Sequence, residues 1–546
     1  MKKKLLAVLL SATMVASLAA CGGSSDAATE STGDAGTAAT TEAAATTEEA
    51  APYELTELTM VVDGTLTATE DSGQKDFEEQ WEAAVGEAIG HDIDLTIKQL
   101  DHSGYNDAVG RLFAGGEYPD VMIMTATMFA QYANSGMLWD MTDAYANASF
   151  QSRITAPEVN ENLKKDGKLY GFAPAYGNGC VTYVKQSWLD AVGISADSIK
   201  TFDDYYNMLL AFHNGDPDGN GKDGDTYGTI AAGYCKTDEA PYIMYLPEFW
   251  QDAYPAIYKN AAGEWVDGFQ EQATKDALAR IAQGRADGAI DPETLTASTK
   301  IAREKYFSNE QSGSAGSFAY WAGTWYQTLT DNLIKNEVDT DLVELAPIAE
   351  VGAYINREAP VWVIIDDGDG DNSREQAIFD AFMDTMLDGG KVQVLWTYGA
   401  EDVHWSTKAE EFSTNKDDPD KKKDYSYADG EFHLKQSPND ENTLWKKNAM
   451  DPALVIAPLA GDYASFASTS ELAAEGNKFF TSHMKDAYSS PASDTYTDNS
   501  GTIIDAKNVA IAAIVEEGAD VDGAIQTYID TVGGIVDQIL AELNAQ

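Results

Sequence analysis

The stretch Leu112-Phe-Ala-Gly-Gly-Glu-Tyr-Pro-Asp-Val-Met-Ile-Met124 decides the fold, because it joins a helix to a buried strand through a short turn. Gly115-Gly116 ends a helical stripe of apolar residues that begins at Tyr105. After Pro119-Asp120, Val121–Met124 is an unbroken apolar run. Such a run is typical of a parallel strand that is buried on both faces.

The same alternation of strand and helix precedes this stretch. Leu58–Val62 and Ile93–Ile97 have the apolar content of strands, and between them apolar residues from Phe77 to Ala88 recur at helical spacing. The order β-α-β-α-β predicts the α/β class, with an open sheet that carries helices on both faces. A further strand and helix are expected at Val361–Ile365 and Arg374–Leu387.

The ends of the predicted strands give the first candidate site residues. Asp63 directly follows the first strand, and Thr127 lies just after the strand that ends at Met124. Ligands of open α/β sheets bind beyond the carboxyl ends of the strands. We therefore expect both side chains to contact a ligand.

The N-terminus has the features of a bacterial lipoprotein leader. Three lysines, Lys2–Lys4, precede an apolar run that is shorter than the roughly 20 residues of a spanning helix. Leu18-Ala-Ala-Cys21-Gly resembles a lipobox, which predicts a signal peptide over 1–20 and lipidation of Cys21. The alternative is an ordinary signal peptide with an incidental cysteine. Residues 21–52 lack aromatic residues and predict a disordered tether on the extracellular face of a Gram-positive cell membrane.

Composition limits the partners and the number of lobes. The chain has 546 residues with 36 basic and 90 acidic side chains, a net charge of −54, which argues against nucleic acid and anionic lipid as partners. The part after Tyr53 is too long for one core and predicts two lobes. No later segment is apolar enough to span a membrane. Cys180 and Cys235 are either a disulfide or two buried thiols.

The sharpest local motif is an acidic, glycine-rich segment that resembles the first half of an EF-hand loop. Oxygen side chains occupy positions 1, 3 and 5, and Gly221 occupies position 6, where the loop turns sharply. Tyr227 stands where the bidentate acid of an EF-hand belongs, so a nearby acid would have to complete the shell. We expect a structural Ca²⁺ ion here, and a solvated acidic loop is the alternative. The candidate ligands are Asp216, Asp218, Asn220, the Lys222 carbonyl, Asp223 and Asp225.

Two other motifs are weaker. Gly219-x-Gly221-x-x-Gly224 matches a dinucleotide fingerprint, but it follows no strand, and its aspartates would repel a pyrophosphate. A second acidic run, Asp366-Asp-Gly-Asp-Gly-Asp-Asn372, could also take calcium, but it lacks a closing acid, so a solvated loop is the preferred interpretation. The sequence contains no HExxH, GxSxG or phosphate-loop motif, so it gives no sign of catalysis.

Aromatic residues are abundant, with 11 Trp, 27 Tyr and 18 Phe. Sugar rings stack on the flat faces of such side chains while polar groups bind the hydroxyls. Clusters occur at Tyr320-Trp321 with Trp325-Tyr326, and at Trp396 with Tyr398, although most aromatic residues in any protein belong to the core.

The order of several short stretches resembles the family 1 extracellular solute-binding proteins, in particular the oligosaccharide-binding lipoproteins of the aldouronate and alginate type, and more distantly the maltodextrin-binding proteins. Each stretch alone is a weak signal. Together they extend over most of residues 53–546. They are Leu112–Ile123, Tyr132–Leu138, Asp166–Pro174, Lys185–Gly193, Ser308–Ser314 with Tyr320-Trp321, and Tyr398–Trp405.

The resemblance implies a two-lobed fold of the class II periplasmic-binding-protein type, with the ligand in a cleft between the lobes. It implies a first lobe of residues 53–173 plus about 346–395, and a second of about 174–345 plus 396–546. The alginate-binding members carry a calcium loop at the position of 216–225. Trp405 could line the cleft or equally belong to the core. The further ligand-binding residues that it implies are Tyr176, Asn178, Tyr242, Trp321 and Trp325.

The implied function is that of a monomeric, lipid-anchored binding component that closes on a carbohydrate and docks on the permease subunits of an ABC importer. Two alternatives stay open. A surface-anchored glycoside hydrolase or lyase would need a pair of carboxylates in the cleft. A binder of peptides or polyamines, or a receptor for a sensor kinase, would have a cleft with different polar groups.

Overall fold

The computed structural model describes residues 53–64, 73–101, 104–133, 135–235, 245–308, 313–413, 424–435, 452–466 and 470–545. None of the helices in these ranges has the length and apolar content that a membrane crossing requires.

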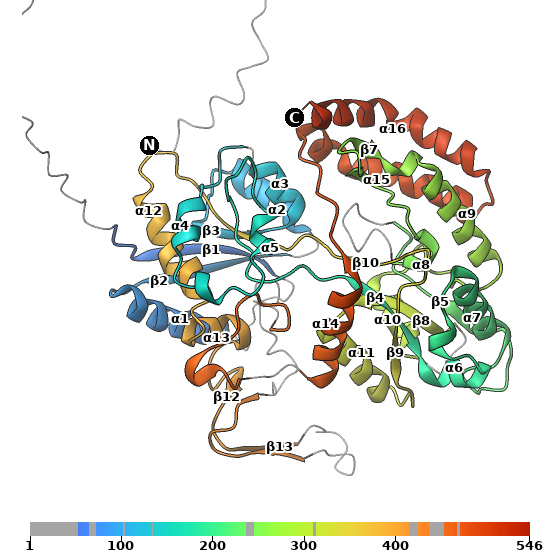
Figure 1. Ribbon diagram of the computed structural model, residues 1–546, viewed down its shortest axis with the longest axis horizontal. Helices are drawn as coiled ribbons and strands as arrows, with labels where there is room; N and C mark the ends of the chain where they lie inside the picture. The colour runs from blue at the N-terminus through green and yellow to red at the C-terminus, as the bar shows by residue number, and fades with distance from the viewer. Residues whose placement is uncertain are drawn as a thin grey trace, which may run out of the picture. The chain divides into compact units, whose positions relative to one another are not determined.

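The first sheet has four strands in the order β11-β3-β1-β2. Strand β1 (Glu57–Gly64) is parallel to both β2 (Asp94–Asp101) and β3 (Val121–Met124), as the apolar runs predicted. Figure 1 shows helices on both faces of this sheet, among them α1 (Gln74–Ile89) and α2 (Tyr105–Ala114). The βαβαβ prediction is therefore confirmed.

The fourth strand of this sheet runs in the opposite direction. Strand β11 (Val361–Ile364) is antiparallel to β3, with Ile364 opposite Val121. The sheet is therefore mixed, and the carboxyl end of β11 lies at the edge opposite to the carboxyl ends of β1 and β3. Helix α12 (Ser373–Ile378) follows β11 and continues as a π-helical segment, Phe379–Asp384.

The second sheet has the order β5-β8-β4-β9. Strand β4 (Cys180–Lys185) is antiparallel to β8 (Ala315–Trp321) and to β9 (Leu342–Leu345). Strand β5 (Tyr227–Thr229) is parallel to β8. All six residues of β4 are buried, as expected for the centre of a sheet that is covered on both faces.

Each sheet has its own large hydrophobic core. The first core is formed by residues between 55 and 173, residues between 359 and 400, and Ile456 and Ala457. The second is formed by residues between 180 and 355, Phe480, and residues between 496 and 543. Trp396 and Ala400 belong to the first core, so residues on both sides of the expected boundary at 395 contribute to it. The exact lobe boundaries stay a prediction.

Glycines allow the chain segments that connect the two cores to approach closely. A Cβ atom on Gly177 would lie 1.9 Å from the Arg357 carbonyl oxygen, and one on Gly179 would lie 2.5 Å from the Phe480 ring. The amide of Arg357 donates to the Asn178 carbonyl at 3.1 Å. Strand β10 (Tyr354–Ile355) pairs with β16 (Met484–Lys485) in the same region.

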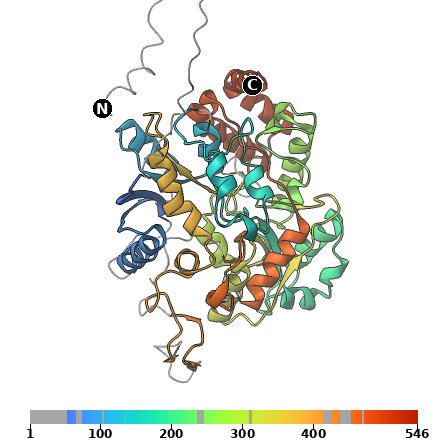
Figure 2. The ribbon, with the colours of Figure 1, turned by 60° about the vertical axis from the view of Figure 1, so that its left-hand side comes forward.

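The remaining elements complete the two α/β units. The two long C-terminal helices, α15 (Asp494–Val515) and α16 (Val521–Asn544), which are red in Figure 2, lie side by side, and both also contact α9 (Gln272–Ala286). The other helices are α3 (Ala126–Tyr132), α4 (Thr142–Asn147), α5 (Glu158–Glu161), α6 (Gln186–Val192), α7 (Phe202–Asn214), α8 (Pro247–Trp250), α9 (Gln272–Ala286), α10 (Thr299–Tyr306), α11 (Thr324–Lys335), α13 (Lys391–Tyr398), α14 (Glu471–His483), α15 (Asp494–Val515) and α16 (Val521–Asn544). The other strands are β6 (Ile257–Lys259), β7 (Trp265–Asp267), β12 (Trp405–Ser406), β13 (Glu410–Ser413), β14 (Asp424–Tyr427) and β15 (His433–Leu434).

Candidate functional site

The carboxyl edge of the first sheet carries the two residues expected from strand-end geometry. Asp63 lies at the end of β1, and Thr127 lies in the first turn of α3, which follows β3. Both are partly exposed. Because β1 and β3 are parallel, their carboxyl ends share one edge. The pKa of Tyr105 is raised, chiefly by burial and further by the charge of Asp63.

The side chain of Asn178 is fixed through both ends of its amide. Its Nδ2 donates to the Ala322 carbonyl at 3.3 Å, and its Oδ1 accepts from the amide of Gly179 at 2.8 Å. Ala322 directly follows β8. The side chain is therefore fixed beside the end of β8, where Trp321 lies.

Arg357 lies over the ring of Trp321. The guanidinium carbon of Arg357 lies 5.1 Å from the ring centroid, within the range of cation–π attraction. The Trp321 carbonyl accepts from the Tyr183 hydroxyl at 2.9 Å, which fixes the end of β8. Arg357 and Trp321 are both partly exposed. Sequence reasoning missed Arg357, because no motif surrounds it and its neighbours come from distant parts of the chain.

Trp325 has a similar environment. It lies in the first turn of α11, with its ring edge-on to Tyr320 at 4.8 Å between centroids. The guanidinium carbon of Arg303 lies 5.0 Å from the Trp325 ring, and the same guanidinium donates to the Tyr320 hydroxyl at 3.2 Å. The two tryptophans of the expected aromatic platform therefore each have an arginine beside them.

The other three expected ligand residues are Tyr176, Tyr242 and Trp405. The Tyr176 hydroxyl donates to Glu158 at 2.9 Å, and burial followed by this bond raises the pKa of Tyr176 to about 12. Tyr242 lies outside the described residues. Trp405 is only 4% exposed, packs against Phe432 and Phe466, and donates from its indole nitrogen to the Gly399 carbonyl. The structure therefore places Trp405 in a core cluster, which favours the core alternative given for it above.

The 216–225 loop brings four of its expected metal ligands together. Asn220 Nδ2 lies 2.9 Å from Asp218 Oδ2 and 3.1 Å from Asp225 Oδ2. Asp216 Oδ2 accepts from the amide of Gly221. The φ of Gly221 is 82°, a left-handed backbone conformation that glycine adopts most readily. Asp216 Oδ1 is buried and has no hydrogen-bond partner among the described residues.

The carboxylates of this loop are close enough to shift the pKa of Asp218. Burial raises the pKa of Asp218, and the neighbouring Asp216 and Asp225 raise it further. Asp223 and Lys222 are exposed. A buried carboxylate oxygen without a donor, beside two further carboxylates, fits the all-oxygen environment that Ca²⁺ takes.

No family model matches the chain. Two proteins of Bacillus subtilis (strain 168) are similar to parts of its sequence. The polygalacturonan/rhamnogalacturonan-binding protein YtcQ is 26% identical over 233 residues, which are 40% of this chain and 44% of YtcQ. Lipoprotein LipO is 26% identical over 204 residues, which are 37% of this chain and 39% of LipO. The matches thus span less than half of each relative.

Solved structures match over a larger part of the chain. The alginate-binding protein AlgQ2, solved without calcium ion, covers 90% of this chain and 97% of its own, with a TM-score of 0.57 at 16% identity. The substrate-binding protein FusA of S. pneumoniae, an EF-hand mutant in complex with fructo-nystose, covers 90% and 98%, with a TM-score of 0.54 at 15% identity. The chain has the two-lobed solute-binding-protein fold.

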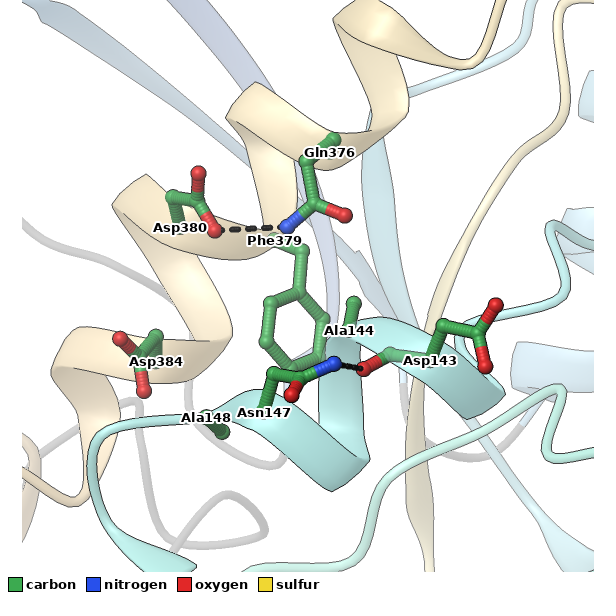
Figure 3. A pocket seen from close by; sticks show the side chains of 8 residues that line it. All are labelled: Asp143, Ala144, Asn147, Ala148, Gln376, Phe379, Asp380 and Asp384. Carbon is green, nitrogen blue, oxygen red and sulfur yellow. Dashed lines mark hydrogen bonds between the residues drawn. The ribbon is translucent and has the colours of Figure 1, made fainter.

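This fold confirms the predicted fold class, and the proteins matched are binding proteins rather than enzymes. A pocket on the surface of the first α/β unit is smaller than a typical ligand pocket. Figure 3 shows this pocket, which has a volume of about 220 Å³ and contains none of the expected ligand residues. Ligand pockets usually have roughly 300–1,000 Å³. Its lining residues are Asp143, Ala144, Asn147, Ala148, Gln376, Phe379, Asp380 and Asp384.

Proposed function

We propose that this chain is the extracellular solute-binding component of an ABC importer, and that it captures an oligosaccharide by closing its two lobes around it. The observation that carries this proposal is the pair of partly exposed tryptophans, Trp321 and Trp325, each with an arginine beside its ring. Flat aromatic faces bind the apolar face of a sugar ring, and nearby polar groups fix its orientation. Catalysis has no part in this function.

We further propose an acidic oligosaccharide, such as a chain of uronic acids, as the ligand class. Arg357 and Arg303 can each donate paired hydrogen bonds to a carboxylate while a sugar ring stacks nearby. The Nε of Arg357 is buried and has no hydrogen-bond partner among the described residues. The name of YtcQ, which binds polygalacturonan, supports the same class.

The net charge of −54 does not oppose an anionic ligand at this position. At physiological ionic strength charges are screened beyond about 8 Å, so acidic side chains farther away than this contribute little to the field at the two arginines. The remote acidic surface slows the approach of an anionic sugar more than it weakens the final contacts.

The roles of the remaining site residues follow from their positions. Asn178 and Thr127 would bind sugar hydroxyls, and Asp63 would accept from a hydroxyl at the edge of the first sheet. Tyr176 would extend the aromatic surface beside the connecting segments. Tyr242 is retained from the sequence resemblance alone.

We propose that the 216–225 loop binds one structural Ca²⁺ ion. Asp216, Asp218, Asn220 and Asp225 would supply side-chain oxygens, and the Lys222 carbonyl would supply a backbone oxygen. An ion between Asp218 and Asp225 would replace the Asn220 amide nitrogen that now lies between them. Both structural relatives are described in terms of calcium or an EF-hand, which supports this proposal.

The location is also a proposal. Lipidation of Cys21 would anchor the chain on the extracellular face of the membrane, with residues 21–52 as the tether and permease subunits as partners. LipO, one of the relatives, is named a lipoprotein, which supports this placement.

A calorimetric panel tests the function. The purified protein is titrated with oligogalacturonides, neutral β-linked and α-linked oligosaccharides, chito-oligosaccharides, peptides and polyamines, and each sugar is then analysed for cleavage. We expect micromolar or tighter binding of an intact acidic oligosaccharide. Binding of only peptides or polyamines would remove the sugar assignment, and cleavage of a bound sugar would identify an enzyme.

A further inference from the structure

A second group of acids comes together at the start of helix α12. Asp366 and Asp367 lie just beyond β11, and Glu375 lies in the first turn of α12. One carboxylate oxygen from each of the three residues lies within 4.8 Å of the others. The sequence pattern of 366–372 alone lacked a closing acid, and the fold supplies it from the following helix.

Glu375 is the decisive member of this group, because its carboxylate is buried and only half satisfied. Glu375 is only 1% exposed. Its Oε1 accepts from the amide of Asp367 at 3.2 Å. Its Oε2 has no hydrogen-bond partner among the described residues. A buried carboxylate with an unsatisfied oxygen is costly unless a proton or a cation compensates it.

No side-chain cation supplies this compensation within the described ranges. The adjacent Arg374 is paired with Asp120 at 2.5 Å. Asp366 and Asp367 each use Oδ1 to accept from the backbone of their own loop, at Gly368 and Asp369. The three carboxylates thus form a concentrated negative site.

We propose that Asp366, Asp367 and Glu375 bind a second calcium ion, at a site separate from the 216–225 loop. Calcium binds oxygen ligands at about 2.3–2.6 Å, so two of its ligands lie at most about 5 Å apart, which matches the spacing of the three acids. Calcium also accepts bidentate carboxylates, which suits a glutamate with one oxygen unsatisfied. Water and backbone carbonyls would complete the shell.

The position of this site defines its role. Because β11 is antiparallel to β3, Asp366 lies near the start of β3, where the Ile365 amide donates to the Asp120 carbonyl at 3.1 Å. Asp63 and Thr127 lie at the opposite edge of the sheet. The ion would therefore join the end of β11 to the first turn of α12 and stabilise the first α/β unit, without touching the sugar.

Glu375→Gln tests the proposal, because glutamine keeps the acceptor for the Asp367 amide and removes the charge. Calcium bound per chain is counted by equilibrium dialysis, and thermal unfolding is measured with and without calcium. The matched control is Asp380→Asn, which removes one charge from the same helical segment outside the group. Both variants are made in the wild type and in a background with Asp216→Asn and Asp218→Asn, which disables the other loop.

We expect Glu375→Gln to bind one calcium ion fewer than its parent in both backgrounds. Without calcium, the unfolding temperature of Glu375→Gln should be equal to or above that of the parent, because a buried repulsion between carboxylates is removed. Added calcium should raise the unfolding temperature of Glu375→Gln less than it raises that of the parent. Asp380→Asn should behave like its parent. If Glu375→Gln binds as many ions as its parent, or if the loop-disabled parent binds none, the site does not exist; neither result bears on sugar binding.

Discussion

The guanidinium carbon of Arg357 lies 5.1 Å from the centroid of the Trp321 ring. Arg357 comes from a segment that connects the two cores, and Trp321 comes from the end of β8 in the second sheet. The backbone of Arg357 is bonded to Asn178, whose side chain is bonded to the residue after Trp321. Three candidate ligand groups are therefore held together by direct contacts.

Trp321→Ala should weaken oligosaccharide binding by roughly 10-fold to 100-fold, because it removes the surface on which a sugar ring stacks. The fold should persist, since Trp321 is only partly buried. Calorimetric titration measures the loss. Trp405→Phe is the control: it loses the bond to Gly399 and about 1 kcal/mol of stability, with unchanged affinity. Equal loss of affinity in both variants would contradict a direct role for Trp321.

Arg357→Gln should separate acidic from neutral ligands. The affinity for a uronic-acid oligosaccharide should fall roughly 10-fold to 100-fold, because a charge-assisted hydrogen bond is lost. The affinity for any neutral oligosaccharide that binds should change much less. Arg285→Gln, which removes the same charge from the end of α9, is the matched control. A uniform change across both ligand types would indicate that Arg357 supports the fold rather than the choice of ligand.

The β-α-β-α-β start of the first α/β unit could be predicted from sequence because its signals are local, whereas the antiparallel direction of β11 could not. Within Leu58–Met124, each strand and helix shows the spacing of apolar residues that is typical of its type. Trp321 and Trp325 were recognised only through resemblance. Arg357 and Glu375 were not recognised, because their roles depend on chain segments that tertiary structure brings together. Trp405 was ambiguous, since a buried tryptophan and a ligand-stacking one look identical in sequence.

Asp216→Asn should remove one bound calcium ion per chain and reduce the rise of the unfolding temperature with calcium. The reason is that Asp216 presents the buried oxygen that has no donor among the described residues. Asp223→Asn is the comparison, because Asp223 is exposed and should be dispensable. Calcium counting and thermal unfolding are the measurements. If Asp223→Asn loses the ion and Asp216→Asn keeps it, the proposed ligand set is wrong.

Stability should fall as the pH rises from about 4.5 to about 7, owing to Glu248. Burial raises the pKa of Glu248 from 4.5 to about 7, and its Oε1 accepts from the Thr182 hydroxyl at 2.6 Å. The folded state therefore favours the protonated form, so this contribution is complete below pH 4.5 and is lost as pH rises through about 7. The difference corresponds to roughly 3 kcal/mol.

Glu248→Gln should reduce the pH dependence by this contribution, because glutamine stays neutral; Glu344, whose pKa is raised to about 8, keeps its own share. Urea unfolding at pH 5 and pH 8 measures the effect, and Glu87→Gln, at an exposed position of α1, is the control. A Glu248→Gln protein with the same pH slope as the wild type would show that Glu248 does not cause it.

Calorimetric titration of the wild type and Trp321→Ala with an oligogalacturonide, followed by chromatography of the recovered sugar, tests the central claim most directly. The account predicts saturable binding to the wild type, at least 10-fold weaker binding to Trp321→Ala, and intact sugar in both cases. Equal affinity of the two proteins for every oligosaccharide that binds, or conversion of the sugar into shorter products, would contradict it.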